Sequence, residues 1–165
     1  MAMNGEIGKR DGMPISTIGV LKDYFFSLKN MRFNSGFKRC VLPEVPNFVS
    51  PFSGQISTLT LGEDTRGVKI RAEGGKISTF TLDQFIAILY FLAQKCQNEG
   101  GDGPLLNNYK PNVFRVRIGD EEKGQIIPIL VRWNRRLLEW NVSYTQNMDF
   151  DGWLWSAESK VFFPE

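Results

Sequence analysis

Basic side chains alternate with apolar ones in several stretches of this sequence, a spacing suited to binding phosphate groups. A β-strand directs successive side chains to opposite faces, so basic residues two positions apart share one face. If the stretches form neighbouring strands of one sheet, that face carries a row of cations. The basic residues in question are Lys69 and Arg71, Arg115 and Arg117, and Arg132.

Two arginines beyond the strand that carries Arg132, and a tryptophan at the end of that strand, extend this pattern. Arg135 and Arg136 occupy the hairpin that follows Arg132, and Trp133 lies beside them. Cationic groups track phosphates and aromatic rings stack on unpaired bases, so the pattern predicts a surface for single-stranded DNA or RNA. The competing interpretation is an ordinary sheet with a solvated outer face and tryptophans in the core. The sequence does not decide which tryptophan rings are exposed.

Residues for catalysis or metal binding are sparse. The chain has no histidine, the commonest general base and metal ligand, and no nucleotide-binding or nucleophile motif. Asp120, Glu121 and Lys123 include an acid-x-lysine pattern of metal-dependent nucleases, but charges in a predicted turn are usually solvated. We therefore expect no enzymatic activity, no cofactor and no metal. A metal-dependent enzyme that uses these residues is kept as the least favoured hypothesis. One other acidic group lacks calcium-loop spacing and consists of Asp149, Asp151 and Glu158.

One helix is strongly predicted, over residues 81–97. Thr81 and Gln84 have the spacing of a capping box, in which each side chain bonds the backbone amide of the other residue. Phe80 and Phe85 flank this cap as a hydrophobic staple. Apolar residues then recur every three or four positions to the end of the segment, so most of the helix surface should be covered.

Most of the remaining chain has the alternation and turn residues of β-strands. Strands are predicted before the helix at residues 55–61, 66–73 and 76–80. After it, strands are predicted at residues 112–118, 125–133, 137–144, 152–156 and 160–163. Residues 15–28 have the spacing of a short amino-terminal helix, with a strand over 24–28 as the alternative. The predicted fold class is α+β, with a mainly antiparallel curved sheet of seven to eight strands packed on one long helix.

The segment that leads into the predicted helix carries a family resemblance. A basic strand over residues 67–71 is followed, after a short gap, by residues 77–85, which enter the helix. This arrangement resembles the transcriptional coactivator positive-cofactor-four and Whirly superfamily. The resemblance implies a curved antiparallel sheet backed by helices, which binds single-stranded DNA or RNA on its basic face and often forms homo-oligomers. It also implies that Lys69, Arg71 and Lys76 contact phosphates.

Composition and charge set further limits. With 20 Lys and Arg against 18 Asp and Glu, the net charge is only +2, so an anionic partner must be held by a local patch. Residues 1–14 are polar and glycine-rich and predict a flexible arm, followed by a single domain over residues 15–165. Cys40 and Cys96 are predicted to be buried free thiols. The sequence shows no signal peptide, lipidation motif or long apolar run, so we expect a cytoplasmic protein with no membrane association.

These patterns lead to one functional hypothesis and one rival. The first is non-enzymatic binding of single-stranded nucleic acid in viral or bacterial replication, recombination or transcription. The rival is a protein-interaction or assembly module that binds no nucleic acid, in which exposed tryptophans and Phe162 with Phe163 dock a partner.

Overall fold

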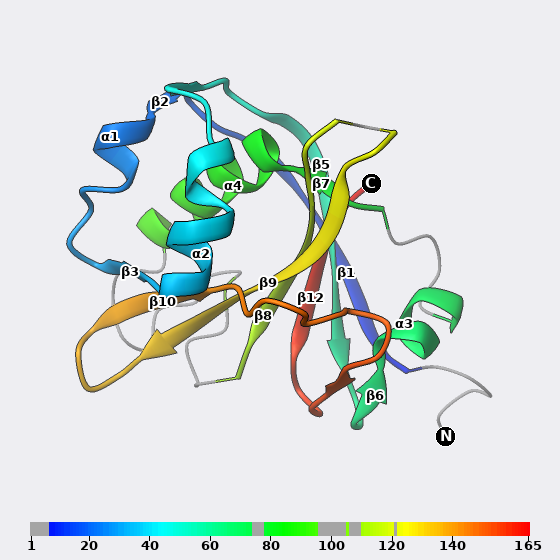
Figure 1. Cartoon of the computed structure of the whole chain (residues 1–165). Helices are drawn as coiled ribbons and strands as arrows, with labels where there is room; N and C mark the ends of the chain where they lie inside the picture. Colours follow the sequence, from blue (N-terminus) through cyan, green and yellow to red (C-terminus); the bar gives the residue numbers. More distant parts are fainter. Residues whose placement is uncertain (1–6, 74–77, 96–104, 106–109, 121) are drawn as a thin grey trace.

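An eight-stranded sheet organises the fold (Figure 1). The computed structural model describes residues 7–73, 78–95, 105, 110–120 and 122–165, which form an α+β structure. The strand order is β1-β5-β12-β8-β9-β10-β3, and the short β7 pairs with β8 beside this path. The strands are β1 (Gly8–Ser16), β3 (Met31–Phe33), β5 (Ser53–Leu61), β7 (Phe80–Thr81), β8 (Asn112–Ile118), β9 (Gln125–Asn134), β10 (Glu139–Ser143) and β12 (Lys160–Pro164).

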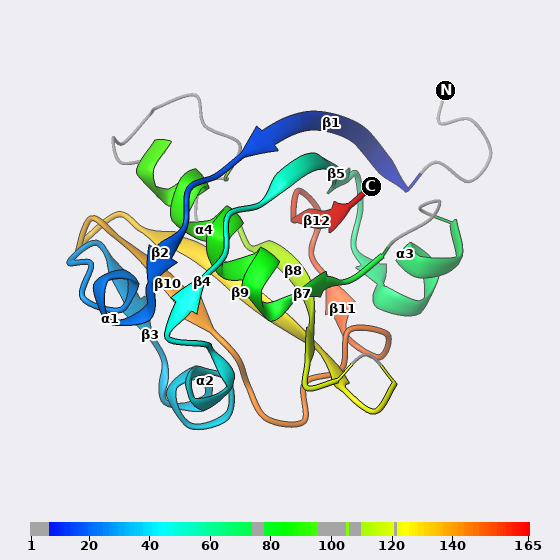
Figure 2. The ribbon, with the colours of Figure 1, turned by 90° about the horizontal axis from the view of Figure 1, so that it is seen from above.

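Helices and two small sheets surround the main sheet in the described residues. Helices α1, α2 and α4 gather on one side of the sheet, and α3 lies on the other (Figures 1 and 2). None of the described helices is both long and apolar enough to cross a membrane. The helices are α1 (Lys22–Phe25), α2 (Ser35–Cys40), α3 (Gly67–Glu73), α4 (Leu82–Lys95) and the 3-10 helix η1 (Leu42–Glu44). The small sheets pair β2 (Val20–Leu21) with β4 (Phe48–Val49), and β6 (Thr65–Arg66) with β11 (Leu154–Trp155).

Separate hydrophobic cores cover the two faces of the main sheet. On the first face, Phe114 of β8 packs with Phe85 of α4. On the second face, Val113 and Leu130 belong to a cluster with Trp155, from the chain between β10 and β12. Strands β8 and β9 are therefore buried on both faces, which explains their nearly continuous apolar sequences. We call the second face, opposite α4, the outer face.

Helix α4 confirms the predicted helix start. The Thr81 backbone amide donates to Gln84 Oε1 at 3.0 Å, and the Gln84 amide donates to Thr81 Oγ1 at 3.2 Å. Phe85, Ile88 and Leu92 are fully buried, as their spacing indicates. The helix extends through Lys95, and the last predicted positions, 96–97, lie outside the described residues.

The main sheet is mixed, so the prediction of a mainly antiparallel sheet on one helix is only partly correct. β12 and β7 run parallel to β8, and β3 runs parallel to β10. After β10 the chain crosses the outer face and then enters the sheet between β5 and β8 as β12. Alternation within a strand reports which face is buried but not the direction of its neighbours, so it could not predict this topology.

The predicted basic strand over residues 66–73 is wrong, because this segment forms the end of β6 and helix α3. The first helical amides, of Gly67 and Val68, donate to the backbone carbonyls of residues 153 and 151, both at 3.0 Å. Ile70 is fully buried in the outer-face core. A seven-residue segment with a buried side chain near its middle satisfies either period, and the distant carbonyls that accept the first amides decide for a helix.

The amino-terminal segment is more ordered than its composition predicts. Residues 8–14, assigned to a flexible arm, belong to β1, which pairs with β5 along its whole length. Main-chain hydrogen bonds hold this edge strand, and they require no apolar side chains. The predicted helix over residues 15–28 shortens to α1, because β1 continues to Ser16 and β2 follows. No described residue in 24–28 forms a strand.

Candidate nucleic-acid interface

Three polar residues form a row across strands β3, β10 and β9. Asn141 is the direct cross-strand partner of Arg32 on β3 and of Arg132 on β9. Directly opposed residues point to the same face of a sheet, with Cβ atoms about 5 Å apart. Two guanidinium groups thus flank one amide on the outer face, and we call these three residues the arginine row. The sequence pattern does not reveal Arg32, because its strand is only three residues long. Asn141 could have been found as a polar position between Trp140 and Val142.

The arginine row borders a hollow of about 380 Å³. The Oδ1 atom of Asn141 is buried and has no hydrogen-bond partner among the described residues. An unsatisfied buried acceptor costs about 1–3 kcal/mol, so a hydrogen-bond donor brought to this atom by a ligand stabilises the site. The hollow is lined by Arg32, Phe33, Asn34, Arg132, Trp133, Asn141, Val142 and Ser143.

Glu139 holds one end of the row in place. Arg32 Nε lies 2.9 Å from Glu139 Oε1, and the two side chains are 67% and 11% exposed. The contact is an ion pair rather than a well-aligned hydrogen bond. A guanidinium group carries five N–H donors, so a pairing through Nε leaves most of them for another acceptor. Arg32 is therefore oriented by a nearly buried carboxylate while most of its surface faces solvent.

The hairpin tip, residues 134–138, joins β9 to β10 next to the arginine row. Asn134 Oδ1 accepts hydrogen bonds from the backbone amides of Arg136 and Leu137, both at 3.1 Å. Leu138 has a φ of 52°, a conformation that costs a residue other than glycine about 1–2 kcal/mol. The side chains of Leu137 and Leu138 are 53% and 57% exposed, and Arg135 and Arg136 are also exposed. The tip thus presents two cations and two leucines on a defined turn.

Arg115, a predicted phosphate ligand, is buried beneath the chain that crosses the outer face. It is 8% exposed, and its guanidinium carbon lies 5.0 Å from the centre of the Phe150 ring. Burial lowers the pKa of Arg115 below its ordinary value, while the charge of Asp151 acts in the opposite direction. Arg115 is part of the packing between sheet and crossing chain, and it does not lie on the accessible surface that the prediction required.

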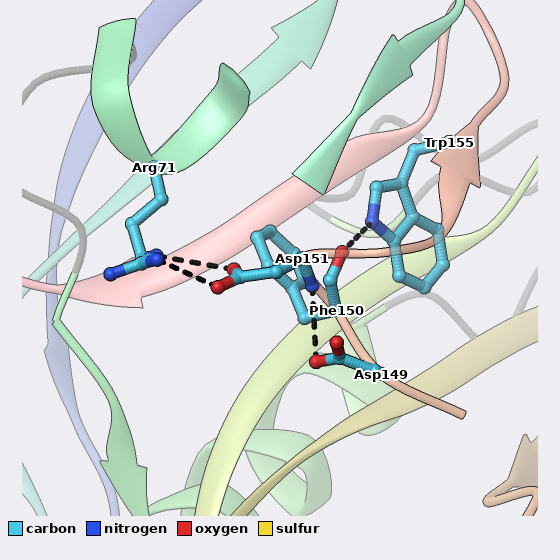
Figure 3. Close-up of polar contacts among 5 residues, drawn as sticks. All are labelled: Arg71, Asp149, Phe150, Asp151 and Trp155. Carbon is cyan, nitrogen blue, oxygen red and sulfur yellow. Dashed lines mark hydrogen bonds and ion pairs between the residues drawn. The ribbon is translucent and has the colours of Figure 1, made fainter. Parts of the chain in front are cut away.

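Lys69 and Arg71 lie on α3 rather than on a sheet face, and both face acidic residues. Figure 3 shows the Arg71 guanidinium directed at the carboxylate of Asp151, with Nε–Oδ1 and Nη2–Oδ2 distances of 3.1 and 2.7 Å. Lys69 Nζ lies 3.9 Å from Glu63 Oε1. These ion pairs tie α3 to neighbouring segments, and the two residues are not brought together with Arg132.

The tryptophans differ in their exposure. Trp133, predicted to stack on bases, is 2% exposed on the α4 side and packs edge-to-face on Trp140 at 5.0 Å between ring centres. Its ring is therefore not available to a base. Trp155 is 1% exposed, and its indole N–H donates to the Phe150 carbonyl at 3.1 Å (Figure 3). Trp153 is 48% exposed, which the strand pattern over residues 152–156 could not distinguish.

Two other predicted nucleic-acid-binding residues stand apart from the row. Arg117 is half-buried at the opposite end of the β8–β9 ladder, where it pairs in register with Ile126. It borders a second hollow, of about 420 Å³, which three carboxylates also line. Lys76 lies outside the described residues. Of the predicted basic residues, the structure brings together Arg132, Arg135 and Arg136.

The acidic turn offers little support for a metal site. Asp120 Oδ1 accepts hydrogen bonds from the backbone amides of Glu122 and Lys123, at 2.9 and 2.5 Å. The carboxylate therefore closes the turn that the sequence predicts, while Glu121 lies outside the described residues. Across the part of the chain that the structure describes, no three histidine, cysteine, aspartate or glutamate residues are grouped to hold a metal ion.

No protein-family model matches the chain, and no significantly similar curated protein or solved structure was found.

Proposed function

We propose that this protein binds single-stranded nucleic acid, without catalysing a reaction, at the β3–β10–β9 end of the outer face. The observation that carries this proposal is the arginine row, in which two guanidinium groups flank a buried amide oxygen that has no hydrogen-bond partner in the described part of the chain. Guanidinium groups bind phosphate through charge-assisted hydrogen bonds, and the Asn141 oxygen accepts a hydrogen bond from the edge of a base. A phosphate beside an accessible base is what an unpaired strand presents.

The preference for a single strand follows from the position of the Asn141 oxygen. Asn141 lines the hollow and its Oδ1 is buried, so only a group that enters the hollow and displaces the side chains around this atom can donate a hydrogen bond to it. In a duplex, the base donors of the Watson–Crick edge are already paired, whereas an unpaired base can turn that edge toward a protein.

Local charge supports the same end of the sheet. The whole chain carries only +2, so the molecule as a whole attracts anions weakly. Arg135 and Arg136 of the hairpin tip follow Arg132 directly in sequence, and Arg32 lies across β10 from it. Four arginines at this end give nucleic acid a local cationic patch, which Glu139 partly offsets.

A charge-neutralising double variant, Arg32→Gln with Arg132→Gln, tests the proposal. Charge-assisted hydrogen bonds contribute about 1.5–3 kcal/mol each, so we expect the loss of two of them to lower affinity for a labelled single strand by about a hundredfold or more. The slope of log affinity against log salt should decrease in magnitude by about 1.4, because each phosphate contact to a single strand contributes about 0.7. Fluorescence anisotropy across a salt series measures both quantities.

The matched control removes two cations elsewhere, Lys9→Gln with Lys69→Gln. Lys9 is exposed on the edge strand β1, and Lys69 is exposed on α3. This control has the same net charge as the test variant and should keep the wild-type affinity within about twofold, a difference of about 0.4 kcal/mol. Equal losses in both variants would reduce the effect to net charge, and failure of the wild-type protein to bind at low salt would rule the proposal out.

An apolar platform beside β2 and β4 favours the rival function, a protein-interaction module. Leu21 and Phe48 are direct cross-strand partners and are 61% and 54% exposed. Ile18 and Tyr24 nearby are 69% and 53% exposed. Association of two copies through such a platform would persist in high salt. Sedimentation velocity of the wild-type protein and of Phe48→Lys tests this function, which requires a dimer that the substitution abolishes.

A further inference from the structure

We infer that the hairpin tip, residues 134–138, inserts its leucines between bases, so that this protein unstacks the strand it binds. The inference rests on the proposed function and adds an activity to it. The tip directly continues β9, which carries Arg132 of the arginine row. A strand held by the row therefore lies within reach of Leu137 and Leu138.

The two leucines are poorly explained by folding. Their side chains remain 53% and 57% exposed, so neither gains the burial that stabilises a core leucine. Leu138 also has a φ of 52°, where glycine or asparagine is favoured. A strained and exposed apolar residue that does not support the fold points to a role in an interaction.

Hydrogen bonds within the turn and two buried tryptophans at its base fix the conformation of the hairpin tip. Asn134 Oδ1 accepts hydrogen bonds from two amides of the turn, which defines the conformation that presents the leucines. At the base of the hairpin, Trp133 and Trp140 are cross-strand partners and are 2% and 0% exposed. An apolar wedge must be preorganised in this way, because unstacking a base step costs free energy that a mobile loop would not recover.

The charges around the leucines select nucleic acid as the occupant. Arg135 and Arg136 are exposed beside them, and Arg132 of the arginine row lies two residues before Asn134 in the sequence. Apolar side chains flanked by arginines match a strand in which phosphates lie a few ångströms from base faces. An anionic lipid surface would also attract such a tip, so binding to anionic vesicles without unstacking is one outcome of the test.

The test uses a single strand that carries 2-aminopurine between adenines, whose fluorescence increases when the base is unstacked. The test variant is Leu137→Ser with Leu138→Asn, because asparagine tolerates the backbone conformation at position 138. The matched control, Val68→Ser with Leu154→Asn, removes two exposed apolar side chains on α3 and β11, outside the apolar platform. We expect the wild-type protein and the control to raise the fluorescence severalfold, and the test variant to lose most of this increase while its affinity changes less than about threefold, or 0.7 kcal/mol.

Each outcome discriminates between the two proposals. Binding without any change in 2-aminopurine fluorescence overturns the wedge but leaves the proposed function standing. No binding by the wild-type protein overturns both. Leucine-dependent binding to vesicles containing phosphatidylserine, without unstacking, overturns the wedge in favour of a lipid surface. The single variant Leu138→Gly controls for misfolding, because glycine suits the backbone conformation at this position. It should reduce unstacking, and its midpoint of urea unfolding should equal or exceed that of the wild-type protein.

Discussion

Substitution of Gly67 by alanine should strongly destabilise the attachment of α3 to the chain that crosses the outer face. A Cβ atom at this position would lie 1.6 Å from the Phe150 carbonyl oxygen and 2.9 Å from the Asp151 Cα. Both are backbone atoms, so no side-chain rotation can relieve the overlap. The crossing chain must move away from the start of α3.

The structure sets the size of this effect. Displacement would break two backbone hydrogen bonds, from Gly67 to Trp153 and from Val68 to Asp151, each worth about 1 kcal/mol. It would also expose much of Phe150, which is 3% exposed in the folded protein, at a further cost of about 1.5–3 kcal/mol. We therefore expect Gly67→Ala to lower the free energy of unfolding by about 3–5 kcal/mol.

Urea unfolding followed by tryptophan fluorescence measures this loss, and Gly62→Ala provides the matched control. A Cβ atom at Gly62 would approach only the Ile7 carbonyl oxygen, at an ordinary distance of 3.8 Å. The control should change the free energy of unfolding by less than about 1 kcal/mol. A similarly small change for Gly67→Ala would refute the close packing of α3 against residues 150–153.

Two further predictions concern the helix cap and the tryptophans. Thr81→Ala removes the acceptor of the Gln84 amide and should lower the free energy of unfolding by about 1 kcal/mol in the same urea assay. An unchanged midpoint would show that the cap does not stabilise α4. Trp153→Phe should remove most of the fluorescence that acrylamide quenches, because Trp153 is 48% exposed and the other three tryptophans are 2% exposed or less. Undiminished quenching would mean that another indole reaches solvent.

Fold predictions succeeded where a few neighbouring residues determine the structure. Thr81 and Gln84 form the capping box at the start of α4, and the strand over residues 112–118 is present as β8. They failed where distant segments decide. Residues 67–73 are helical because carbonyls of residues 151 and 153 accept their first amides, and β1 forms because β5 lies beside it.

For the candidate site as well, local features could be predicted from the sequence, and features that depend on distant segments could not. The sequence by itself determined that basic residues recur beside apolar strands and that Arg132, Arg135 and Arg136 lie together around a hairpin, since adjacent residues cannot be separated by folding. Only the tertiary structure decided that Arg115 is covered by Phe150 and that Trp133 faces α4. It also brought Arg32 beside Asn141, through the parallel pairing of β3 with β10. Periodicity assigns a side chain to a face of its own strand, whereas cover and cross-strand neighbours depend on contacts between segments far apart in the chain.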